Sequence, residues 1–532
     1  MSEIKGYAKG VALLTIAALF VKVLSMVYRI PFQNLVGDQG FFIYQQVYPF
    51  VAIFMTWTSS GLAIAVSKML VDESNQNFGR QGAVAQLLYR SLVVGAFVLF
   101  ILMYGFSDVF AQAMGDPQLA SLLKIGSFVI FTTPVLAMYK GSLQAKGNLK
   151  VVATIQVMEQ LARVAIILGG TAYVMATSKS LYLAGEIAVL GTVAGEVIGA
   201  IALVLYMRKS KQYTPLLHSQ QALTAKRDLI KKMIVVSLSA SMSSLLLILF
   251  QLVDSFTVFD TLMKHAMTKI EAMEEKGIYD RGQPLVQVGL VIATSLSLAV
   301  VPMIAHAMKS QRTNKINFFI RVTYQATLLF AVAAAVGLIL VMPYLNKTLF
   351  ETADLSKVLQ VYVLQIIMLS IVMAMTAVLQ GLGYRKWPTY ILAISLLIKI
   401  ILNEVLVFQL GIVGAAWSSN IALLMGALGL IYYVKRVLDI KLASFQFYKT
   451  TALATLVMYS GAELFIYFEK QLTILPLEGR SYAAVMLLLI TIIGASLFIV
   501  WITKFKILTI KEWLLLPMGN KMAALQLFLN KK

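Results

Sequence analysis

A few basic side chains lie inside long apolar stretches of this sequence, where charge is costly. Lys22 and Arg29 are two helical turns apart in the first stretch, and Arg163 and Lys399 lie in two later ones. Inserting such a residue into a bilayer costs about 2.5–3.5 kcal/mol, and the side chain usually faces a cavity or a partner. Desolvated Lys and Arg match phosphate and carboxylate groups in charge and geometry. These residues therefore predict a water-accessible site for an anionic group.

Two further residues extend this candidate site. Arg281 immediately precedes another apolar stretch and would add a cation at the outer mouth of a cleft, although a surface-loop role is the simpler interpretation. Asn403 lies four residues after Lys399, so both occupy one helix face. Arg29 also has a simpler interpretation, since it precedes Pro31 and its side chain can reach the outer interface. The predicted substrate-binding residues are Lys22, Arg29, Arg163, Arg281, Lys399 and Asn403.

Acidic residues also fall within or beside the apolar stretches. Glu159 lies four residues before Arg163, a spacing that allows an ion pair within one helix and a purely structural role for both. Four acids are candidates for coupling transport to Na⁺ or H⁺, and their spacing does not select one of them. They are Glu159, Glu196, Asp254 and Glu404.

Several kinds of chemistry have no sequence support. The chain has no cysteine, which excludes disulfides and thiolate ligands. The three histidines, His218, His265 and His306, are scattered and form no metal-ligand pattern. The phosphate-binding Gly-x-x-x-x-Gly-Lys-Ser/Thr loop and the Gly-x-Ser-x-Gly nucleophile motif are both absent from the sequence. We therefore expect no metal, no cofactor and no enzymatic activity.

The composition indicates a membrane protein. Of 532 residues, 59% are hydrophobic and 13% charged, whereas soluble domains carry about 25% charged residues. The apolar residues come in blocks of about 20, the length of a membrane-spanning helix. We predict an all-α integral membrane protein with fourteen transmembrane helices. The predicted spans are 10–29, 41–66, 88–106, 119–142, 151–176, 182–206, 231–254, 284–307, 318–343, 355–381, 387–408, 412–434, 448–468 and 482–503.

The net charge of +21 is distributed as membrane topology requires. Lys and Arg gather in every second loop, most densely in 207–232, which is the positive-inside pattern. Because they form no basic stripe with interleaved aromatic residues, nucleic-acid binding is not expected. The pattern places both termini in the cytoplasm. No small-residue cleavage site follows the first apolar stretch, so we expect a retained helix rather than a signal peptide.

An internal repeat divides the chain. Polar motifs recur 236 positions apart, although chance similarity between Leu- and Ala-rich helices is an alternative explanation. The recurring pairs are Gln144-x-x-Gly147-x-x-Lys150 with Gln380-x-x-Gly383-x-x-Lys386, Arg163 with Lys399, and Thr58-Ser59 with Thr294-Ser295. Six helices per repeat predict two parallel lobes in a pseudo-two-fold relation, as in alternating-access transporters.

The predicted organisation follows from this repeat. An N-lobe (1–206) and a C-lobe (233–436) are joined by a basic cytoplasmic loop (207–232). Two additional helices (437–504) and a basic cytoplasmic tail (505–532) follow.

Motifs along nearly the whole chain resemble one family. They include Lys22-x-Leu24, Gly37-Asp38-Gln39-Gly40, Gln156-Val157-x-Glu159-Gln160-x-x-Arg163, Gln380-Gly381-x-Gly383 and Gly411-Ile412-x-Gly414-Ala415-Ala416. In order and spacing these resemble the multidrug/oligosaccharidyl-lipid/polysaccharide flippase superfamily. The similar branch is that of bacterial polysaccharide transporters, which includes the stage V sporulation protein B group and lipid II flippases.

The resemblance implies a function and a location. It implies two six-helix lobes around a cationic cavity, and a lipid-facing groove, formed with the two additional helices, for a polyprenyl tail. Lys22 matches the position of a cavity arginine of lipid II flippases. The implied activity is alternating-access translocation of an undecaprenyl-diphosphate-linked saccharide across the bacterial cytoplasmic membrane. The implied partners are that lipid-linked saccharide, membrane lipids, and Na⁺ or H⁺.

Three alternatives remain open from the sequence. A multidrug cation antiporter of the same superfamily would need an acidic, aromatic-lined cavity and no additional helices. A membrane polymerase or glycosyltransferase would need catalytic carboxylates, for which Asp254, Asp260, Glu271, Glu274, Glu275 and Asp280 are the candidates in or beside the outer loop. A non-transporting scaffold for envelope enzymes would not need the buried cations.

Overall fold

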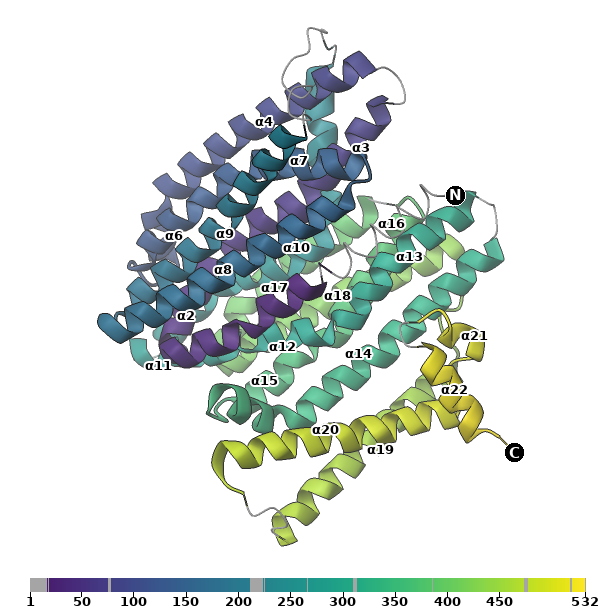
Figure 1. The fold of residues 1–532 in the computed structure, drawn as a ribbon. Helices are drawn as coiled ribbons and strands as arrows, with labels where there is room; N and C mark the ends of the chain where they lie inside the picture. The colour runs from purple at the N-terminus through teal and green to yellow at the C-terminus, as the bar shows by residue number, and fades with distance from the viewer. Residues whose placement is uncertain are drawn as a thin grey trace. The chain divides into compact units, whose positions relative to one another are not determined.

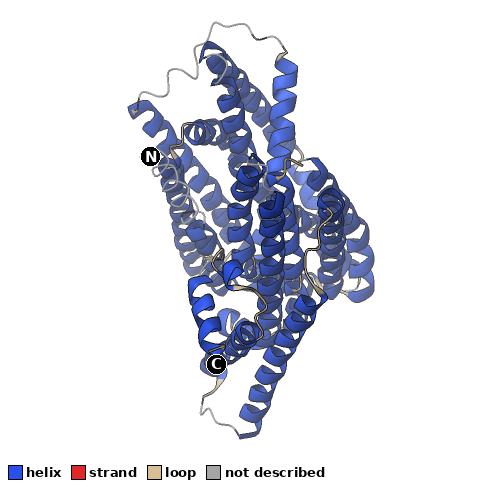
Figure 2. Ribbon diagram, turned by 90° about the vertical axis from the view of Figure 1, so that its right-hand side faces the viewer, coloured by secondary structure: helices blue, strands red, loops and turns tan. Residues whose placement is uncertain are grey.

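The protein is helical in the part of the chain that the structure describes. The computed structural model describes residues 17, 19–74, 78–210, 223, 225–265, 267–309, 313–384, 386–472, 477–516 and 519–531, and no strand occurs among them (Figures 1 and 2). This confirms the all-α prediction.

Among the described residues, thirteen helical segments are long and apolar enough to cross a membrane. They are Leu19–Glu73, Arg80–Gly105, Leu119–Ala145, Leu149–Thr177, Leu181–Lys209, Lys226–Lys264, Val291–Met308, Asn314–Phe350, Ser356–Gly381, Lys386–Leu410, Ile412–Leu438, Phe445–Leu472 and Gly479–Lys504. The first is 55 residues long, about 80 Å as a helix, enough for two crossings. It contains most of the first two predicted spans, while residues 10–16 and 18 lie outside the described residues. The count of fourteen stays a prediction.

The long first segment is interrupted twice. Within α2 (Arg29–Thr56), Gly37 has φ 68° and ψ −175°, a conformation that only glycine adopts readily, so the helix axis changes direction there. A π-helical turn, η1 (Trp57–Leu62), then separates α2 from α3 (Ala63–Ser74). Single π turns inside α-helices are rare, and those that occur often lie at functional sites.

One compact unit comprises Met1–Asp280 and Asn403–Phe408. Its remaining helices are α4 (Phe78–Gly105), α5 (Ser107–Ala113), α6 (Leu119–Ser127), the 3₁₀ turn η2 (Phe128–Thr132), α7 (Thr133–Ala145), α8 (Leu149–Thr177), α9 (Leu181–Lys209), α10 (Lys226–Lys264) and α11 (Lys269–Asp280). Helices α8 and α9 pack closely because glycines lie at their contact. A Cβ on Gly195 would approach the carbonyl oxygen of Glu159 to 2.8 Å.

A second compact unit comprises Arg281–Leu402 and Gln409–Lys532. Its helices are α12 (Gly282–Gly289), α13 (Val291–Lys309), α14 (Thr313–Phe350), α15 (Ser356–Val363), α16 (Gln365–Gly381), α17 (Lys386–Leu410), α18 (Ile412–Leu438), α19 (Phe445–Leu472), α20 (Gly479–Lys504), α21 (Ile510–Trp513) and α22 (Gly519–Leu529). Helices α19 and α20, the two predicted additional spans, pack against α14. In Figure 1 they are the yellow-green helices beside α14.

The predicted tail at 505–532 contains folded structure. Trp513, the last residue of α21, is fully buried and donates a hydrogen bond to Gln526 of α22 over 2.8 Å. It belongs to an apolar cluster with Phe447 of α19 and Phe498 of α20. The segment after α20 is therefore held against the membrane helices, and its cytoplasmic location stays a prediction.

The compact units do not divide at the predicted loop 207–232. Helix α10, which the repeat assigns to the second lobe, packs against α2, η1 and α3. The indole of Trp57 donates to Ser237 of α10 over 3.1 Å, and a Cβ on Gly61 would lie 2.8 Å from the Ser237 carbonyl oxygen. Helix α10 therefore clusters with the first unit. The division into lobes stays a prediction.

The internal repeat recurs in the backbone. Gly147 and Gly383 both adopt a left-handed conformation, with φ 74° and 90°. The glycine amide donates to the carbonyl of Gln144 in the first motif (3.0 Å) and of Gln380 in the second (3.1 Å), and the next amide bonds one residue further back at 2.8 Å in both. This is the Schellman helix ending, which favours glycine. The repeated Gln-x-x-Gly motif thus encodes the same helix end twice.

Helix contacts repeat as well. A Cβ on Gly199 of α9 would overlap the Glu159 side chain of α8, and a Cβ on Gly426 of α18 would lie 3.1 Å from the Ser395 hydroxyl of α17. Ser395 follows Glu159 by the same 236 positions. Gly426-Ala427 corresponds to Gly199-Ala200, with a shorter loop before it that reduces the offset to 227 positions. Equivalent helix pairs therefore approach at equivalent glycines, which chance similarity does not explain.

Candidate functional site

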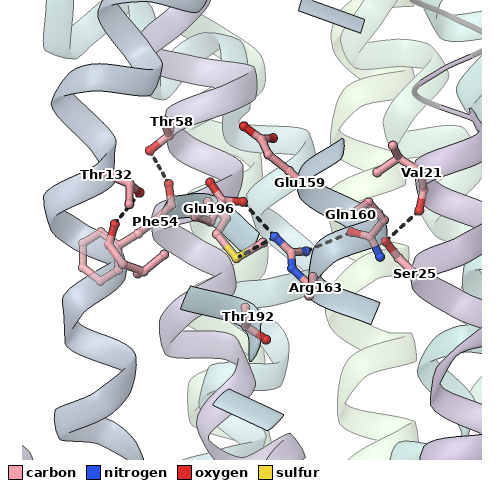
Figure 3. Close-up of polar contacts among 12 residues, drawn as sticks. Val21, Ser25, Phe54, Thr58, Thr132, Glu159, Gln160, Arg163, Thr192 and Glu196 are labelled. Carbon is pink, nitrogen blue, oxygen red and sulfur yellow. Dashed lines mark hydrogen bonds and ion pairs between the residues drawn. The ribbon is translucent and has the colours of Figure 1, made fainter. Parts of the chain in front are cut away.

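Arg163 lies inside the helices of the first unit. Figure 3 shows its guanidinium between Glu196 of α9 and Gln160 of α8. It donates to the Glu196 carboxylate over 2.7 Å and to the Gln160 side chain over 3.1 Å, and its Nη2 lies 3.7 Å from the sulfur of Met55. Its Nε is buried and has no hydrogen-bond acceptor among the described residues. Arg163 is thus held by its neighbours, while its Nε–H group remains available as a hydrogen-bond donor.

Glu159 does not pair with Arg163 as the spacing of four suggested. Its carboxylate instead contacts the ammonium of Lys140 on α7, at 2.8 and 2.9 Å to the two oxygens. Both side chains are buried. The Glu159 side chain occupies the space that a Cβ on Gly199 of α9 would need, so this glycine leaves room for the pair with Lys140. Each acid predicted for ion coupling in this unit's first half, Glu159 and Glu196, is therefore matched by a cation from a different helix.

Lys140 is a buried cation that the sequence analysis did not select. It lies within the predicted span 119–142, so its position inside an apolar stretch was the signal available. Its proximity to the end of that span made it resemble an interfacial lysine. It is only 1% exposed, so it belongs with the buried charges.

Arg29 lies inside the protein and not at an interface. It is buried, and its guanidinium carbon lies 4.6 Å from the ring centre of Tyr48, in cation–π range. The hydroxyl groups of Tyr28 and Tyr44 lie 2.9 Å apart beside it. The interpretation of Arg29 as a snorkelling residue is therefore wrong, because the part of α2 beyond the kink at Gly37 places Tyr44 and Tyr48 beside it. The tyrosines were not among the predicted site residues; Tyr28 lies between the first two resembling motifs, and Tyr44 and Tyr48 follow the second.

Lys22 precedes α2 and is half-buried. It lies within the helical segment that begins at Leu19, and its depth in the membrane stays a prediction. Its role in binding stays a prediction.

Asp254 and Asn403 were predicted for different roles and lie together. The Asn403 amide donates to Asp254 over 3.0 Å and to the Thr257 hydroxyl over 2.6 Å. Tyr279 of α11 donates to the same carboxylate over 3.1 Å. Glu404, in contrast, is exposed, because adjacent residues point about 100° apart around a helix. The structure thus favours Asp254 over Glu404 as the centre of a polar cluster.

Helix α11, in the predicted outer loop, covers this cluster. The Lys276 ammonium contacts both oxygens of Asp280, at 2.6 and 2.7 Å. Burial raises the pKa of Asp280, and the neighbouring Lys276 ammonium opposes this rise. A Cβ on Gly277 would overlap the backbone of Asp38, so α11 lies directly against the kink of α2. The predicted loop is therefore an ordered cover over this end of the first unit.

Two predicted cations lie in the second unit. Lys399 is fully buried, and its ammonium donates to the carbonyl of Ala415 (3.1 Å) and to the hydroxyls of Ser418 (3.0 Å) and Ser419 (2.7 Å). Like Arg163, it reaches the helix that follows its own.

Arg281 is also buried and is not a surface-loop residue. It donates to Asn346 over 2.8 Å and to Thr352 over 3.0 Å. Its guanidinium carbon lies 4.9 Å from the ring centre of Phe350. Arg281 therefore ties the start of α12 to the end of α14.

An apolar groove of about 490 Å³ lies among α12, α13, α14, α19 and α20 of the second unit. Its lining is almost entirely aliphatic and aromatic, and Gly337 and Gly494 leave part of it open. We call it the apolar groove; its lining residues include Val288, Ile292, Phe330, Ala333, Gly337, Val341, Met458, Ile490, Gly494, Phe498 and Ile502. The two additional helices form one wall of it, as the resemblance implied.

Comparison with family models decides the affiliation. A model described as "Polysaccharide biosynthesis protein" matches residues 7–308, and the MatE model matches residues 277–405. The chain belongs to the polysaccharide biosynthesis protein family. It is thereby a member of the multidrug/oligosaccharidyl-lipid/polysaccharide flippase superfamily, which confirms the resemblance found in the sequence.

Three relatives from Bacillus subtilis extend along most of this chain. The uncharacterized membrane protein YabM is 32% identical over 515 residues, covering 97% of this chain and 96% of YabM. Lipid II flippase MurJ is 22% identical over 450 residues, with 80% and 82% covered. Stage V sporulation protein B is 23% identical over 444 residues, with 82% and 85% covered.

Solved structures share the fold. Lipid II flippase MurJ in an inward closed conformation matches with a TM-score of 0.70 at 17% identity, covering 93% of this chain and 99% of that one. An inward-facing multidrug resistance MATE family transporter matches with a TM-score of 0.64 at 14% identity, with 80% and 99% covered. The family member described here therefore has the fold of these transporters.

Proposed function

We propose that this protein is a flippase that moves an undecaprenyl-diphosphate-linked saccharide across the bacterial cytoplasmic membrane. The observation that carries the proposal is the apolar groove formed with α19 and α20. A groove of this kind suits a long isoprenoid chain, which stays in lipid while the polar head crosses. The similarity to a lipid II flippase along more than four-fifths of its length supports the same cargo class.

The buried cations are the proposed ligands of the diphosphate. The proposed ligands are Lys22, Arg29, Arg163, Arg281 and Lys399. Arg163 supports this role because its Nε remains available as a donor. Charge-assisted hydrogen bonds to phosphate oxygens are roughly twice as strong as neutral ones. Glu196 would hold Arg163 in place between transport cycles.

Asp254 is the proposed coupling residue. Its carboxylate lies with Asn403, Thr257 and Tyr279, so oxygen and amide groups converge on one acid. A hard cation such as Na⁺, or a proton, binds such oxygen groups. An inside-negative potential would also assist outward movement of an anion, by about 2.3 kcal/mol per charge for each 100 mV.

Transport measured in liposomes tests the proposal. The purified protein is reconstituted with fluorescent undecaprenyl-diphosphate saccharide, and the fraction exposed on each side is followed in time. Lys399→Ala is expected to abolish movement, because it removes a fully buried ammonium. The matched control is Lys386→Ala, at the exposed start of the same helix. Equal transport by both variants would exclude Lys399 as a diphosphate ligand.

A multidrug cation antiporter is the second candidate function. The match to the MatE model over residues 277–405 favours it, and so does the tyrosine cluster around Arg29. Its test is efflux of a lipophilic cation from the same liposomes. Efflux without saccharide movement would replace the flippase proposal.

A further inference from the structure

A second cavity lies at one end of α14, α19 and α20 in the second unit. Its volume is about 480 Å³. We call it the basic pocket; it is lined by Arg321, Gln325, Lys441, Ala443, Ser444, Gln446, Phe447, Thr450, Phe505, Lys506, Ile507, Thr509 and Glu512. Three separate chain segments form it: the first part of α14, residues 441–450 leading into α19, and residues 505–512 from the end of α20 into α21. The proposed transport path uses none of these residues.

The pocket is electropositive. Arg321, Lys441 and Lys506 line it, and among the described residues none of the three takes part in an ion pair. Its single acid, Glu512, is already engaged, because its carboxylate accepts the Thr509 backbone N–H over 2.7 Å in a capping box. The pocket therefore contains three positive side chains and one negative side chain that is already hydrogen-bonded. This excess of positive charge favours binding of an anion.

The walls of the pocket are fixed by hydrogen bonds between segments. The Gln325 amide donates to the Leu442 carbonyl over 3.2 Å, joining α14 to the segment before α19. The hydroxyls of Tyr324 and Tyr448 lie 3.1 Å apart and join α14 to α19 itself. The buried Trp513 anchors the third segment. These hydrogen bonds hold together the segments that carry the three cations.

Lys506 occupies a backbone position that favours glycine. It follows α20 with φ 50°, and its N–H donates to Thr503 while that of Ile507 donates to Ile502, at 3.3 and 3.1 Å. This is another Schellman ending, in which a non-glycine residue is strained. The strain is compatible with a role for the side chain, which here supplies one of the three cations.

The basic pocket and the apolar groove lie end to end along the same helices. On α20, Ile502 lines the groove and Phe505 lines the pocket, three residues or about 5 Å apart along the axis. On α14, Gln325 lines the pocket and Phe330 the groove, about 7.5 Å apart. A molecule with an anionic head and an apolar chain matches this pair of cavities.

We propose that the basic pocket binds the phosphate head group of an anionic membrane lipid, whose chain enters the apolar groove beside Ile502. Arg and Lys bind phosphate oxygens through charge-assisted hydrogen bonds, and basic pockets between membrane helices bind lipid head groups. The distribution of Lys and Arg predicts that this end of the helices faces the cytoplasm, where the leaflet is anionic. The bound lipid tethers the segment 505–512 to α14 and α19. The head-group site shares no residue with the proposed diphosphate ligands, whereas the lipid chain would share the apolar groove with the isoprenoid chain of the cargo.

Lipid binding by the purified full-length protein tests the proposal. Native mass spectrometry in a neutral detergent follows phosphatidylglycerol, with phosphatidylcholine as the zwitterionic lipid and glycerol phosphate as the chainless anion. The test variant carries Arg321→Gln, Lys441→Gln and Lys506→Gln. The matched control removes three exposed cations outside the pocket, by Arg436→Gln, Lys511→Gln and Lys521→Gln.

We expect the wild type and the matched control to bind phosphatidylglycerol at least tenfold more tightly than the pocket variant does. Two results would overturn the proposal. One is equal affinity of both triple variants, which would assign binding to net charge. The other is equal affinity for glycerol phosphate and phosphatidylglycerol, which would make the pocket a site for soluble anions.

Lys506→Gly distinguishes a ligand role from a structural one. Glycine relieves the left-handed backbone, so the unfolding temperature in lipid-free detergent should not fall. Phosphatidylglycerol affinity should nevertheless drop several-fold, because the ammonium is gone. Full retention of affinity would exclude Lys506 as a ligand.

Discussion

Two buried ion pairs join three helices of the first unit, Lys140 with Glu159 and Arg163 with Glu196. Removing one partner of a buried pair leaves an uncompensated charge, whereas removing both is often nearly neutral. The pairs therefore fix the positions of α7, α8 and α9 relative to one another, and they add little net stability. Their charge balance also means that an anionic ligand near Arg163 competes with Glu196, so binding and helix position are linked.

Lys140→Met is expected to lower the free energy of unfolding by about 3–5 kcal/mol, because Glu159 is left buried and unpaired. The double variant Lys140→Met, Glu159→Leu should recover most of this loss. Thermal unfolding in detergent measures both. Arg480→Gln is the control, since its pair with Glu351 is at least half exposed and contributes about 0–1 kcal/mol. A single variant as stable as the control would show that the pair does not lock the helices.

At the scale of elements, glycines mark where helices end or approach each other. Gly147 and Gly383 end α7 and α16 in the same left-handed turn, and each directs the chain into the helix that carries Arg163 or Lys399. In each half, this helix ending fixes where the next helix begins, and therefore where its buried cation lies.

Gly383→Ala is expected to cost about 1–2 kcal/mol, since an L-residue is strained at φ 90°. A Cβ there would meet nothing within 4 Å, so the cost comes from the backbone alone. Gly95→Ala is the control, because its Cβ also meets open space but inside helix α4, where alanine is favoured by about 0.5–1 kcal/mol. Chemical or thermal unfolding compares them. A neutral Gly383→Ala would contradict the left-handed ending.

The apolar groove gives a functional prediction at the same scale. Gly337 of α14 lines the apolar groove, and a Cβ at this position would meet no other atom within 4 Å. Gly337→Phe should therefore fill the groove and slow saccharide transport at least tenfold while the protein remains folded. Gly95→Phe, outside the groove, should transport normally. Normal transport by Gly337→Phe would separate the groove from the cargo path.

The sequence was most informative about elements and least informative about partners. Apolar blocks and a constant offset predicted the helices, the repeated Gln-x-x-Gly ends and the buried cations. They did not predict that Glu159 pairs with Lys140 or that Asn403 meets Asp254, since partner choice depends on helix rotation and on close approaches at residues such as Gly199. The folded segment after α20 was also missed, because its basic residues mask the burial of Trp513.

At the scale of the whole molecule, the proposed flippase function implies alternating access, in which the two predicted repeats rock relative to each other. Helix α10, the first helix of the second predicted repeat, lies against η1 and α3 of the first. If the repeats rock as proposed, this contact must open during each cycle. The π turn of η1 suits such a place, because its backbone hydrogen bonding is already irregular.

A crosslink between η1 and α10 tests this movement. The natural chain contains no cysteine, so introduced pairs have no background. A Cβ on Gly61 would lie 2.9 Å from the Ser241 hydroxyl oxygen, which is close enough for a disulfide between Gly61→Cys and Ser241→Cys. Oxidation of this double variant in liposomes should stop saccharide movement, and a reductant should restore it.

A second disulfide separates movement from general rigidity. Thr58 of η1 and Thr133 of α7 have hydroxyls 3.0 Å apart, and both belong to the first predicted repeat, so Thr58→Cys with Thr133→Cys joins helices that should move together. Its oxidation should leave transport intact, and the single Gly61→Cys variant reports the effect of crowding beside Trp57. Transport that continues after complete oxidation of the Gly61–Ser241 pair would mean that η1 and α10 never part. The cargo would then have to cross without rocking of the repeats, since an intact covalent link excludes opening at this contact.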